Sequence, residues 1–326
     1  MIDARLADWL LDSDPAPRWQ VERDLLGAAP EIWQATRARV AHEGFGRELL
    51  DEEDDDGAWA GGAYFPAEFA FAEDTPQPWT ATTWALNDLR EWGVDAAALA
   101  GTAEKLADVR WEYENLPYWG GEVDVCINSW PLSNGLWLDA DVDGLVDWLL
   151  EHQQDDGGWN CEWIDGSSVS SFHSTLNALL GLLDYQIRTG DAARVAKARY
   201  GGEEYLLARD LFRRRSSGEP FDDRVFVLFH PRRWFYGVLP AADCFRRAAH
   251  ADAAAPDLRM TDAIESIRSE REDDGSWLQG DRLGGDVRFH VDVRPGQPSK
   301  WVTFHACRIL GLWDGAHPSR PFSAAT

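Results

Sequence analysis

The sequence predicts an all-α protein, a ring of helical hairpins in which each hairpin has an outer and an inner helix. One loop occurs three times, with two acidic residues, a glycine, a small residue and a tryptophan. The copies are Asp55-Asp56-Gly57-Ala58-Trp59, Asp155-Asp156-Gly157-Gly158-Trp159 and Asp273-Asp274-Gly275-Ser276-Trp277. Each copy follows an apolar helical stretch and precedes a second helix that opens near an aromatic residue. A unit that recurs at this scale indicates a repeat architecture.

The helices of the three full units follow from apolar residues at helical spacing, as in the run Leu176, Leu179, Leu180 and Leu183. We expect outer helices at 36–50, 142–154 and 262–271, and inner helices at 79–92, 171–188 and 301–313.

Two weaker units fill the gaps between the full ones. The first pairs 97–114 with an inner segment at 125–138, and the second pairs 192–215 with an inner helix at 232–250. Because a repeat array folds as one body, we expect a single domain over 1–326. Its parts are a capping segment at 1–30, repeats at 31–315 and a tail at 316–326.

The repeated loop has a physical basis. Glycine permits the left-handed turn that ends the outer helix, and the aspartates before it accept backbone N–H groups. The tryptophan is then a large apolar anchor between neighbouring hairpins.

Composition excludes several classes of function. The net charge is −26, so phosphate repulsion makes nucleic acid an unfavourable partner. No run of about eighteen apolar residues predicts a membrane span, and the N-terminus has no signal-peptide pattern. Four cysteines without close pairing fit a reduced, cytoplasmic protein.

One copy of the loop carries a longer motif. Trp148-Leu149, Gln153, Gly157 and Trp159 match the Gln-Trp motif of squalene and oxidosqualene cyclases, whereas Glu53 and Arg271 replace the glutamine in the other copies. The chain therefore resembles the prenyltransferase and squalene-cyclase repeat superfamily over about residues 30–315. The resemblance implies an α/α toroid whose central cavity opens at the rim formed by the inner-helix N-termini.

Four residues near these helix starts could bind a metal: Asp124, Cys126, Cys161 and His173. Thiolate, imidazole and carboxylate are suitable zinc ligands. Resemblance to protein prenyltransferase β-subunits implies zinc on Asp124, Cys126 and His173. Resemblance to lanthionine cyclases, which share the toroid architecture, implies Cys126, Cys161 and His173 instead. The alternative without a metal is two buried cysteines and a helix-capping histidine.

A basic and aromatic segment, 230–236, is a second candidate site. Arg232 and Arg233 are expected at an inner-helix N-terminus, where guanidinium groups and free helix N–H groups suit a diphosphate. The alternative is pairing with surface carboxylates.

Aromatic residues at inner-helix positions could line the cavity and stabilise a carbocation. The candidates, with core packing as the alternative, are Tyr236, Trp79, Trp84, Trp130, Trp234 and Trp301.

The chemistry is less well defined than the fold. Cyclases that begin by protonation need an Asp-x-Asp-Asp stretch at an inner-helix start, and the aspartates at 139–143 instead fit a helix cap. We therefore expect a cyclase-like or prenyltransferase-like protein that binds an apolar small molecule or a prenyl diphosphate, with zinc as candidate cofactor. The alternatives are a non-catalytic lipid-binding toroid and zinc-dependent peptide-thiol chemistry of the lanthionine-cyclase type. The sequence names no catalytic residue, substrate or partner subunit.

Overall fold

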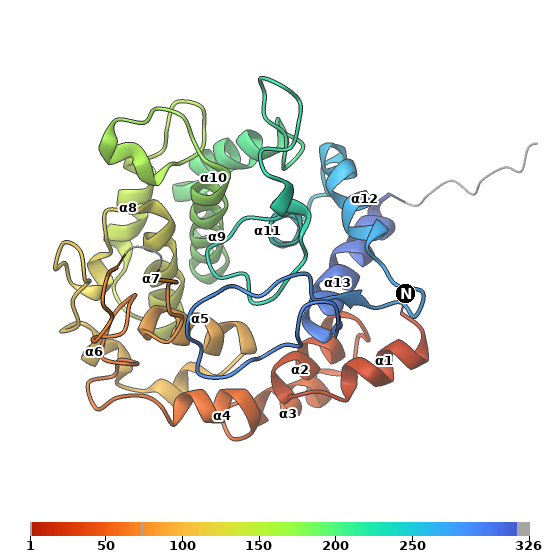
Figure 1. Ribbon diagram of the computed structural model, residues 1–326, viewed down its shortest axis with the longest axis horizontal. Helices are drawn as coiled ribbons and strands as arrows, with labels where there is room; N and C mark the ends of the chain where they lie inside the picture. The colour runs from red at the N-terminus through yellow and green to blue at the C-terminus, as the bar shows by residue number, and fades with distance from the viewer. Residues whose placement is uncertain (1, 73–74, 318–326) are drawn as a thin grey trace, which may run out of the picture.

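The prediction of an all-α protein is confirmed by a computed structural model that describes residues 2–72 and 75–317 (Figure 1). The last nine residues of the predicted tail lie outside the described part. Two short strands, β1 (Trp277–Leu278) and β2 (Pro298–Ser299), pair antiparallel. The α-helices are α1 (Ala4–Leu11), α2 (Pro15–Asp24), α3 (Pro30–Arg39), α4 (Gly44–Leu50), α5 (Thr82–Trp92), α6 (Thr102–Leu106), α7 (Val125–Leu138), α8 (Asp143–Glu151), α9 (Phe172–Thr189), α10 (Ala192–Leu207), α11 (Val238–Asp252), α12 (Thr261–Ser269) and α13 (Lys300–Ala316).

Six helices contact one another in turn around the centre of the molecule: α5, α7, α9, α11, α13 and α2 (Figure 1). Helix α2 then reaches back to α5, because Trp19 Nε1 donates to the Trp92 carbonyl at 2.7 Å and Gln20 Nε2 to the Glu91 carbonyl at 3.0 Å. Helices α6 and α8 pack against α7, α10 against α9, and α12 against α11.

The three repeated loops share one hydrogen-bond pattern. In each, the indole N–H donates to the carbonyl ten residues earlier, at 2.7–2.8 Å: Trp59 to Leu49, Trp159 to Leu149 and Trp277 to Ile267. In each, the tryptophan backbone N–H donates to a threonine of the next inner helix, at 2.9–3.0 Å: Thr82, Thr175 and Thr303. The rings are at most 1% exposed. Each tryptophan therefore joins the helix before its loop to the helix after it.

The turn of each loop is left-handed at its glycine, with φ of +82° at Gly57, +94° at Gly157 and +89° at Gly275. Gln153 Nε2 donates to the Gly157 carbonyl at 2.6 Å and to the Ala198 carbonyl of α10 at 2.7 Å. Of the two residues that replace the glutamine, one keeps its hydrogen bond to the loop glycine and the other does not. Arg271 donates to its own glycine carbonyl, whereas Glu53 accepts from Thr102 of α6.

Several predicted helices are shorter than expected. The expected helix at 36–50 is divided into α3 and α4, with Gly44 at a φ of +59° between them. The expected helix at 97–114 is reduced to a 3-10 turn (Ala96–Leu99) and α6. Helix α10 ends at Leu207 rather than 215, before Asp210 and Leu211 turn left-handed.

The largest difference concerns α11, which begins at Val238 and not at residue 232. Proline lacks a backbone N–H and is accommodated best in the first turn of a helix, whereas in the interior it costs a hydrogen bond. Pro240 meets this condition when the helix begins at Val238, and Gly237 precedes it in an extended conformation. Arg232 and Arg233 therefore lie in the loop before α11, and the expectation that they occupy a helix N-terminus is wrong.

The capping segment also differs from the expectation. Helix α2 begins at Pro15, where proline suits the first helical position and Asp14 caps it by accepting the Ala16 N–H. The segment is part of the central series of helices, since α2 contacts both α13 and α5.

A long connection between β1 and β2 passes over the end of the structure where α5 and α13 begin (Figure 1). Trp79 donates from its backbone N–H to the Asp286 carbonyl at 2.8 Å and from Nε1 to the Gly284 carbonyl at 2.7 Å. Arg288 donates to the Thr80 carbonyl at 3.1 Å. This segment therefore lies against the residues that lead into α5.

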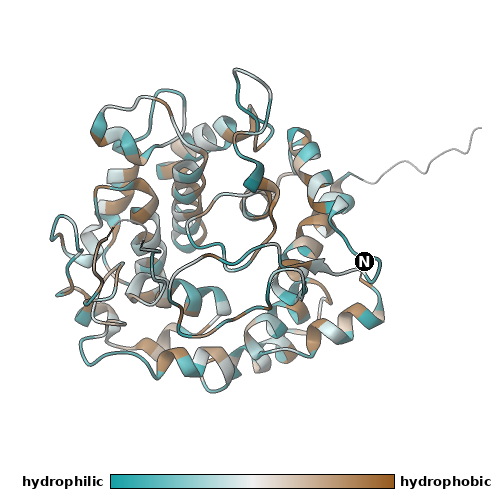
Figure 2. Cartoon of the chain, viewed as in Figure 1, coloured by the Kyte–Doolittle hydropathy of each residue, from teal (hydrophilic) through white to brown (hydrophobic). Residues whose placement is uncertain are grey.

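Apolar residues gather on particular sides of the helices (Figure 2). They form two buried clusters, and α13 contributes to both, through Trp301 and Phe304 to one and through Val302 and Ile309 to the other. No helix among the described residues is both long and apolar enough to span a bilayer.

Candidate functional site

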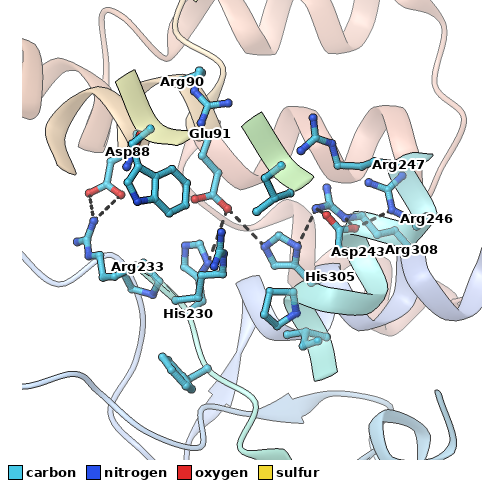
Figure 3. A pocket seen from close by; sticks show the side chains of 18 of the residues that line it. Asp88, Arg90, Glu91, His230, Arg233, Asp243, Arg246, Arg247, His305 and Arg308 are labelled. Carbon is cyan, nitrogen blue, oxygen red and sulfur yellow. Dashed lines mark hydrogen bonds and ion pairs between the residues drawn. The ribbon is translucent and has the colours of Figure 1, made fainter. Parts of the chain in front are cut away.

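A cavity of about 310 Å³ lies between the inner helices (Figure 3). Its walls come from α2, α5, α7, α9, α11 and α13 and from the loop before α11. Seven arginines line it, against three carboxylates, in a chain whose net charge is −26. The charged lining residues are Arg23, Arg90, Arg232, Arg233, Arg246, Arg247, Arg308, Asp88, Glu91 and Asp243. The cavity therefore has the opposite charge to the protein as a whole.

Asp243 of α11 holds two of these arginines. It accepts from Arg246 Nε at 2.7 Å and from Arg308 Nε and Nη2 at 2.9 and 2.7 Å. Burial alone would raise the pKa of the Asp243 carboxyl, but the two guanidinium groups outweigh it and hold the pKa well below its usual range. The carboxylate is therefore ionised and neutralises one of the two arginines, while Asp24 lies 3.8 Å from Arg308 Nη1 and partly offsets the other.

Asp184 of α9 repeats this arrangement. It accepts from Arg90 at 3.0 Å and also from Arg247. Its pKa is lowered as well, because the nearby guanidinium groups overcome the effect of burial. Each of the two aspartates thus fixes two arginines at the cavity wall and neutralises one.

Arg232 has no carboxylate within 4 Å among the described residues. Its guanidinium donates to the Phe235 carbonyl and the Asn177 side chain at 3.2 and 3.1 Å, and it lies over the Trp130 ring at 5.1 Å. Burial lowers its pKa to about 10, which still leaves the group charged at neutral pH. Arg232 therefore presents to the cavity a charge without a directly paired carboxylate, with Glu91 as the nearest opposing influence.

Arg233 differs from its neighbour, because both oxygens of Asp88 accept from its Nη1 at 2.8 and 2.9 Å. Its φ is +52°, an uncommon value for a residue other than glycine. Asp88 is only 9% exposed, and its burial raises its pKa despite the contact with Arg233. The Arg233 charge is consequently neutralised within the protein.

We expect the Arg233→Gln substitution to lower the free energy of unfolding by about 2 kcal/mol, because it leaves Asp88 buried without its partner. The cost stays moderate because an unpaired buried carboxyl can take up a proton. The double substitution Arg233→Gln with Asp88→Asn should recover most of the lost free energy of unfolding, as measured by urea denaturation. An equal loss in the single and double variants would contradict this pairing.

Glu91, His230 and His305 form the one group of three potential metal ligands within the described residues whose donor atoms all lie within 4.8 Å. Glu91 Oε1 is 3.9 Å from His230 Nδ1 and 3.8 Å from His305 Nε2 (Figure 3). Its side chain is 40% exposed, but only to the cavity. The surrounding protein keeps it away from bulk water, and this loss of solvation raises its pKa. Burial also keeps both imidazoles neutral, because it lowers the pKa of His230 to about 4 and holds the pKa of His305 well below its usual value.

The neighbouring arginines disfavour a metal ion at this group. Arg308 Nη2 lies 2.9 Å from His305 Nδ1, and a guanidinium only donates. The Nδ1 atom therefore accepts, and the proton of the neutral ring sits on Nε2, the atom that faces Glu91. Metal binding there would require this proton to leave Nε2 in a cavity that already carries excess positive charge. A carboxyl with a raised pKa beside a neutral imidazole is better suited to proton transfer.

The four zinc ligands expected from the sequence are only partly brought together. Cys126 Sγ and Cys161 Sγ are 3.1 Å apart. His173 lies among aromatic rings, with its centroid 5.6 Å from that of Trp234 and 6.1 Å from that of Tyr236. Among the described residues, Asp124, Cys126, Cys161 and His173 do not form a group of three with donor atoms within 4.8 Å of one another.

The predicted aromatic residues are similarly divided. Trp84 and Trp130 line the cavity. Trp79 lines a smaller hollow of about 40 Å³ beneath the connection between β1 and β2, and Trp301 lies mainly under His230, with ring centroids 4.5 Å apart. Trp234 stacks on Phe235, and the Tyr236 hydroxyl donates to the Leu211 carbonyl. Neither Trp234 nor Tyr236 lines the cavity.

Sequence reasoning missed most of the charged lining residues. Arg246 follows Asp243 by three residues and Arg308 follows His305 by three, so each pair lies on one helix face. This spacing is the signal that the sequence contains. It does not show that the faces of α5, α11 and α13 meet around one space.

Comparison with known proteins adds little to this description. No protein-family model matches the chain, and no curated protein matches it. One solved structure, described as a protein from Actinoplanes, is 15% identical, with a TM-score of 0.47 over 95% of this chain and 98% of the other. A likeness at this level carries no argument about function.

Proposed function

We propose that the protein is an α/α toroid that binds a diphosphate-bearing isoprenoid in its central cavity. The observation that carries the proposal is the charge of the cavity wall. The seven lining arginines lie near five carboxylates, Asp24, Asp88, Glu91, Asp184 and Asp243, which leaves a net charge of about +2. Guanidinium groups fixed in advance by buried carboxylates suit the oxygens of a diphosphate.

The ligand's apolar portion has a place in the same cavity. Trp84, Trp130, Leu180 and Leu239 provide apolar wall beside the arginines. A neutral hydrocarbon alone would leave the excess positive charge in a space without a counter-charge, which is costly. The toroid part of the proposal is supported by the closed order of inner-helix contacts and by the three equivalent loops.

A zinc ion on Glu91, His230 and His305 is the second candidate, favoured by the 3.8–3.9 Å separations of their donor atoms. Metal analysis of the purified protein decides between the candidates. If the purified protein contains one zinc ion per chain and His305→Gln loses it, the cavity is a zinc site rather than an anion site. Zinc that survives this change would place the metal elsewhere.

The test of the proposed function is calorimetric titration with inorganic diphosphate, geranyl diphosphate and geraniol. We expect the two diphosphates to bind and geraniol to bind much more weakly. Arg232→Gln should weaken both diphosphates by about 1.5–3 kcal/mol, or roughly 10- to 150-fold, through loss of one charge-assisted contact. Because Arg232 has no carboxylate partner, its removal should cost only its hydrogen bonds to Phe235 and Asn177, roughly 1–2 kcal/mol of the free energy of unfolding.

The matched control is Arg268→Gln, which removes an arginine at the protein surface that is paired with Asp314. It should leave all three affinities unchanged. Equal binding of geraniol and geranyl diphosphate, or no binding of either, would refute the proposal. Release of inorganic diphosphate from bound geranyl diphosphate would identify an enzyme, whereas recovery of intact ligand would identify a carrier.

A further inference from the structure

Two cysteines that are distant in sequence meet outside the cavity. Cys126 lies in the first turn of α7, and Cys161 begins the 3-10 turn Cys161–Asp165 in the loop between α8 and α9. Their sulfur atoms are 3.1 Å apart, and both residues are partly exposed. Neither residue lines the cavity described above.

The contacts of the two sulfur atoms are unequal. Cys161 Sγ accepts from the Cys126 backbone N–H at 3.4 Å and from the Ser174 hydroxyl at 3.3 Å. The Cys126 N–H is one of the free donors in the first turn of α7, and this end of a helix stabilises a negative charge. Cys161 is therefore placed to carry the thiolate, and Cys126 to remain the thiol.

The pKa values agree with this asymmetry. The contact between the two sulfur atoms lowers the pKa of Cys161, with a further contribution from Ser174, whereas the same contact and burial raise the pKa of Cys126. A thiolate at a helix N-terminus beside a second thiol is the arrangement that reactive cysteine pairs use.

The pair is too close for two ligands of one zinc ion. Two thiolates of a tetrahedral site lie about 3.8 Å apart, given Zn–S distances of about 2.3 Å. The sulfur atoms at 3.1 Å are instead close enough to bond to each other after a small movement of the side chains.

We propose that Cys126 and Cys161 are a thiol–disulfide exchange site that reacts with low-molecular-weight disulfides. The Cys161 thiolate attacks one sulfur of the external disulfide, forms a mixed disulfide and expels one thiolate, which takes up a proton. The Cys126 thiol then loses its proton to solvent and attacks Cys161 Sγ, which breaks the mixed disulfide and expels the second thiolate. Two protein thiols are oxidised to a disulfide, and one external disulfide is reduced to two thiols.

The internal disulfide would join the start of α7 to the loop before α9 across 35 residues. Because a cross-link lowers the entropy of the unfolded chain, we expect the melting temperature to rise by about 5 °C on oxidation.

The experiment incubates the full-length protein with oxidised glutathione at pH 7.5 and locates the modified residues by peptide mass spectrometry. The wild type should lose two free thiols, with Cys126 linked to Cys161, while Cys244 and Cys307 stay reduced. Cys126→Ser should trap one glutathione on Cys161, because no second thiol can resolve it. Cys161→Ser should react at least about tenfold more slowly, since the better nucleophile is absent.

Both serine variants should melt close to the reduced wild type, which separates loss of reactivity from loss of fold. Retention of four free thiols in the wild type would overturn the proposal. So would stable adducts on both cysteines without an internal bond, or equal reaction at Cys244 and Cys307. None of these readouts depends on diphosphate binding.

Discussion

The Asp243→Asn substitution should lower the free energy of unfolding by about 3–5 kcal/mol, because it leaves two buried arginines without their shared carboxylate. Arg246, Arg308 and Asp243 have side chains that are 14%, 10% and 15% exposed. Water therefore screens the loss only slightly, and asparagine offers one neutral acceptor where the carboxylate met three N–H groups. Urea denaturation at pH 7 measures the loss.

The pH dependence of the stability difference between the wild type and Asp243→Asn tests the same ion pairs. Since the folded pKa of Asp243 lies below its unfolded value of about 3.9, its contribution is complete above that value and is lost as pH falls through the folded pKa. The gap between wild type and variant should therefore be constant between about pH 5 and 7 and narrow below about pH 4. A gap that widens in acid would show that Asp243 is not stabilised as the ionised form.

Asp314→Asn is the matched control, because Asp314 also accepts two hydrogen bonds from one arginine, Arg268. Their side chains are 55% and 36% exposed. An exposed ion pair contributes at most about 1 kcal/mol, so this variant should unfold nearly as the wild type does. Similar losses at positions 243 and 314 would contradict the role of burial.

The Trp159→Ala substitution should have a comparable effect and lower the free energy of unfolding by about 3–5 kcal/mol. The ring is fully buried, and its Nε1 donates to the Leu149 carbonyl at 2.8 Å. Truncation would open a cavity between α8, α9 and α10 and leave that carbonyl without its partner. Chemical denaturation followed by circular dichroism measures the change.

Trp159→Phe separates the two contributions, because it keeps most of the apolar ring and removes the indole N–H. We expect it to cost about 1–2 kcal/mol. Trp148→Ala is the control for loss of a tryptophan as such, since Trp148 is partly exposed on α8 and stacks on His152. If all three variants unfold alike, the loop tryptophan is not the anchor inferred from its threefold repetition.

The helical units could be predicted because they depend on local features. The repeated Asp-Gly-x-Trp loop, with its left-handed glycine and buried indole, marks the same junction each time. Helix ends were less predictable where a single residue prevents a helix that the apolar spacing of its neighbours favours. Pro240 and Gly237 delay α11 by six residues relative to the apolar pattern, which continues without interruption from Trp234.

The candidate site was predicted only in small part. Arg232, Trp84 and Trp130 were expected at a cavity and line it. Arg232 and Arg233 are equivalent in sequence, yet Asp88 neutralises only the second, from a helix 145 residues away. Of the expected zinc ligands, Cys126 and Cys161 lie together, whereas His173 lies among aromatic rings.

The sequence by itself determined the all-α class, the repeated loop and the series of helices, because spacing, turn glycines and buried tryptophans act over one or two turns of chain. Only the tertiary structure decided which charges meet. Four helices contribute the charged residues Arg90, Asp184, Arg247, Asp243 and Arg308. The sequence between these residues does not indicate that they meet. Electrostatic energy depends on separation in space and on burial, and folding sets both of these only when the helices pack together.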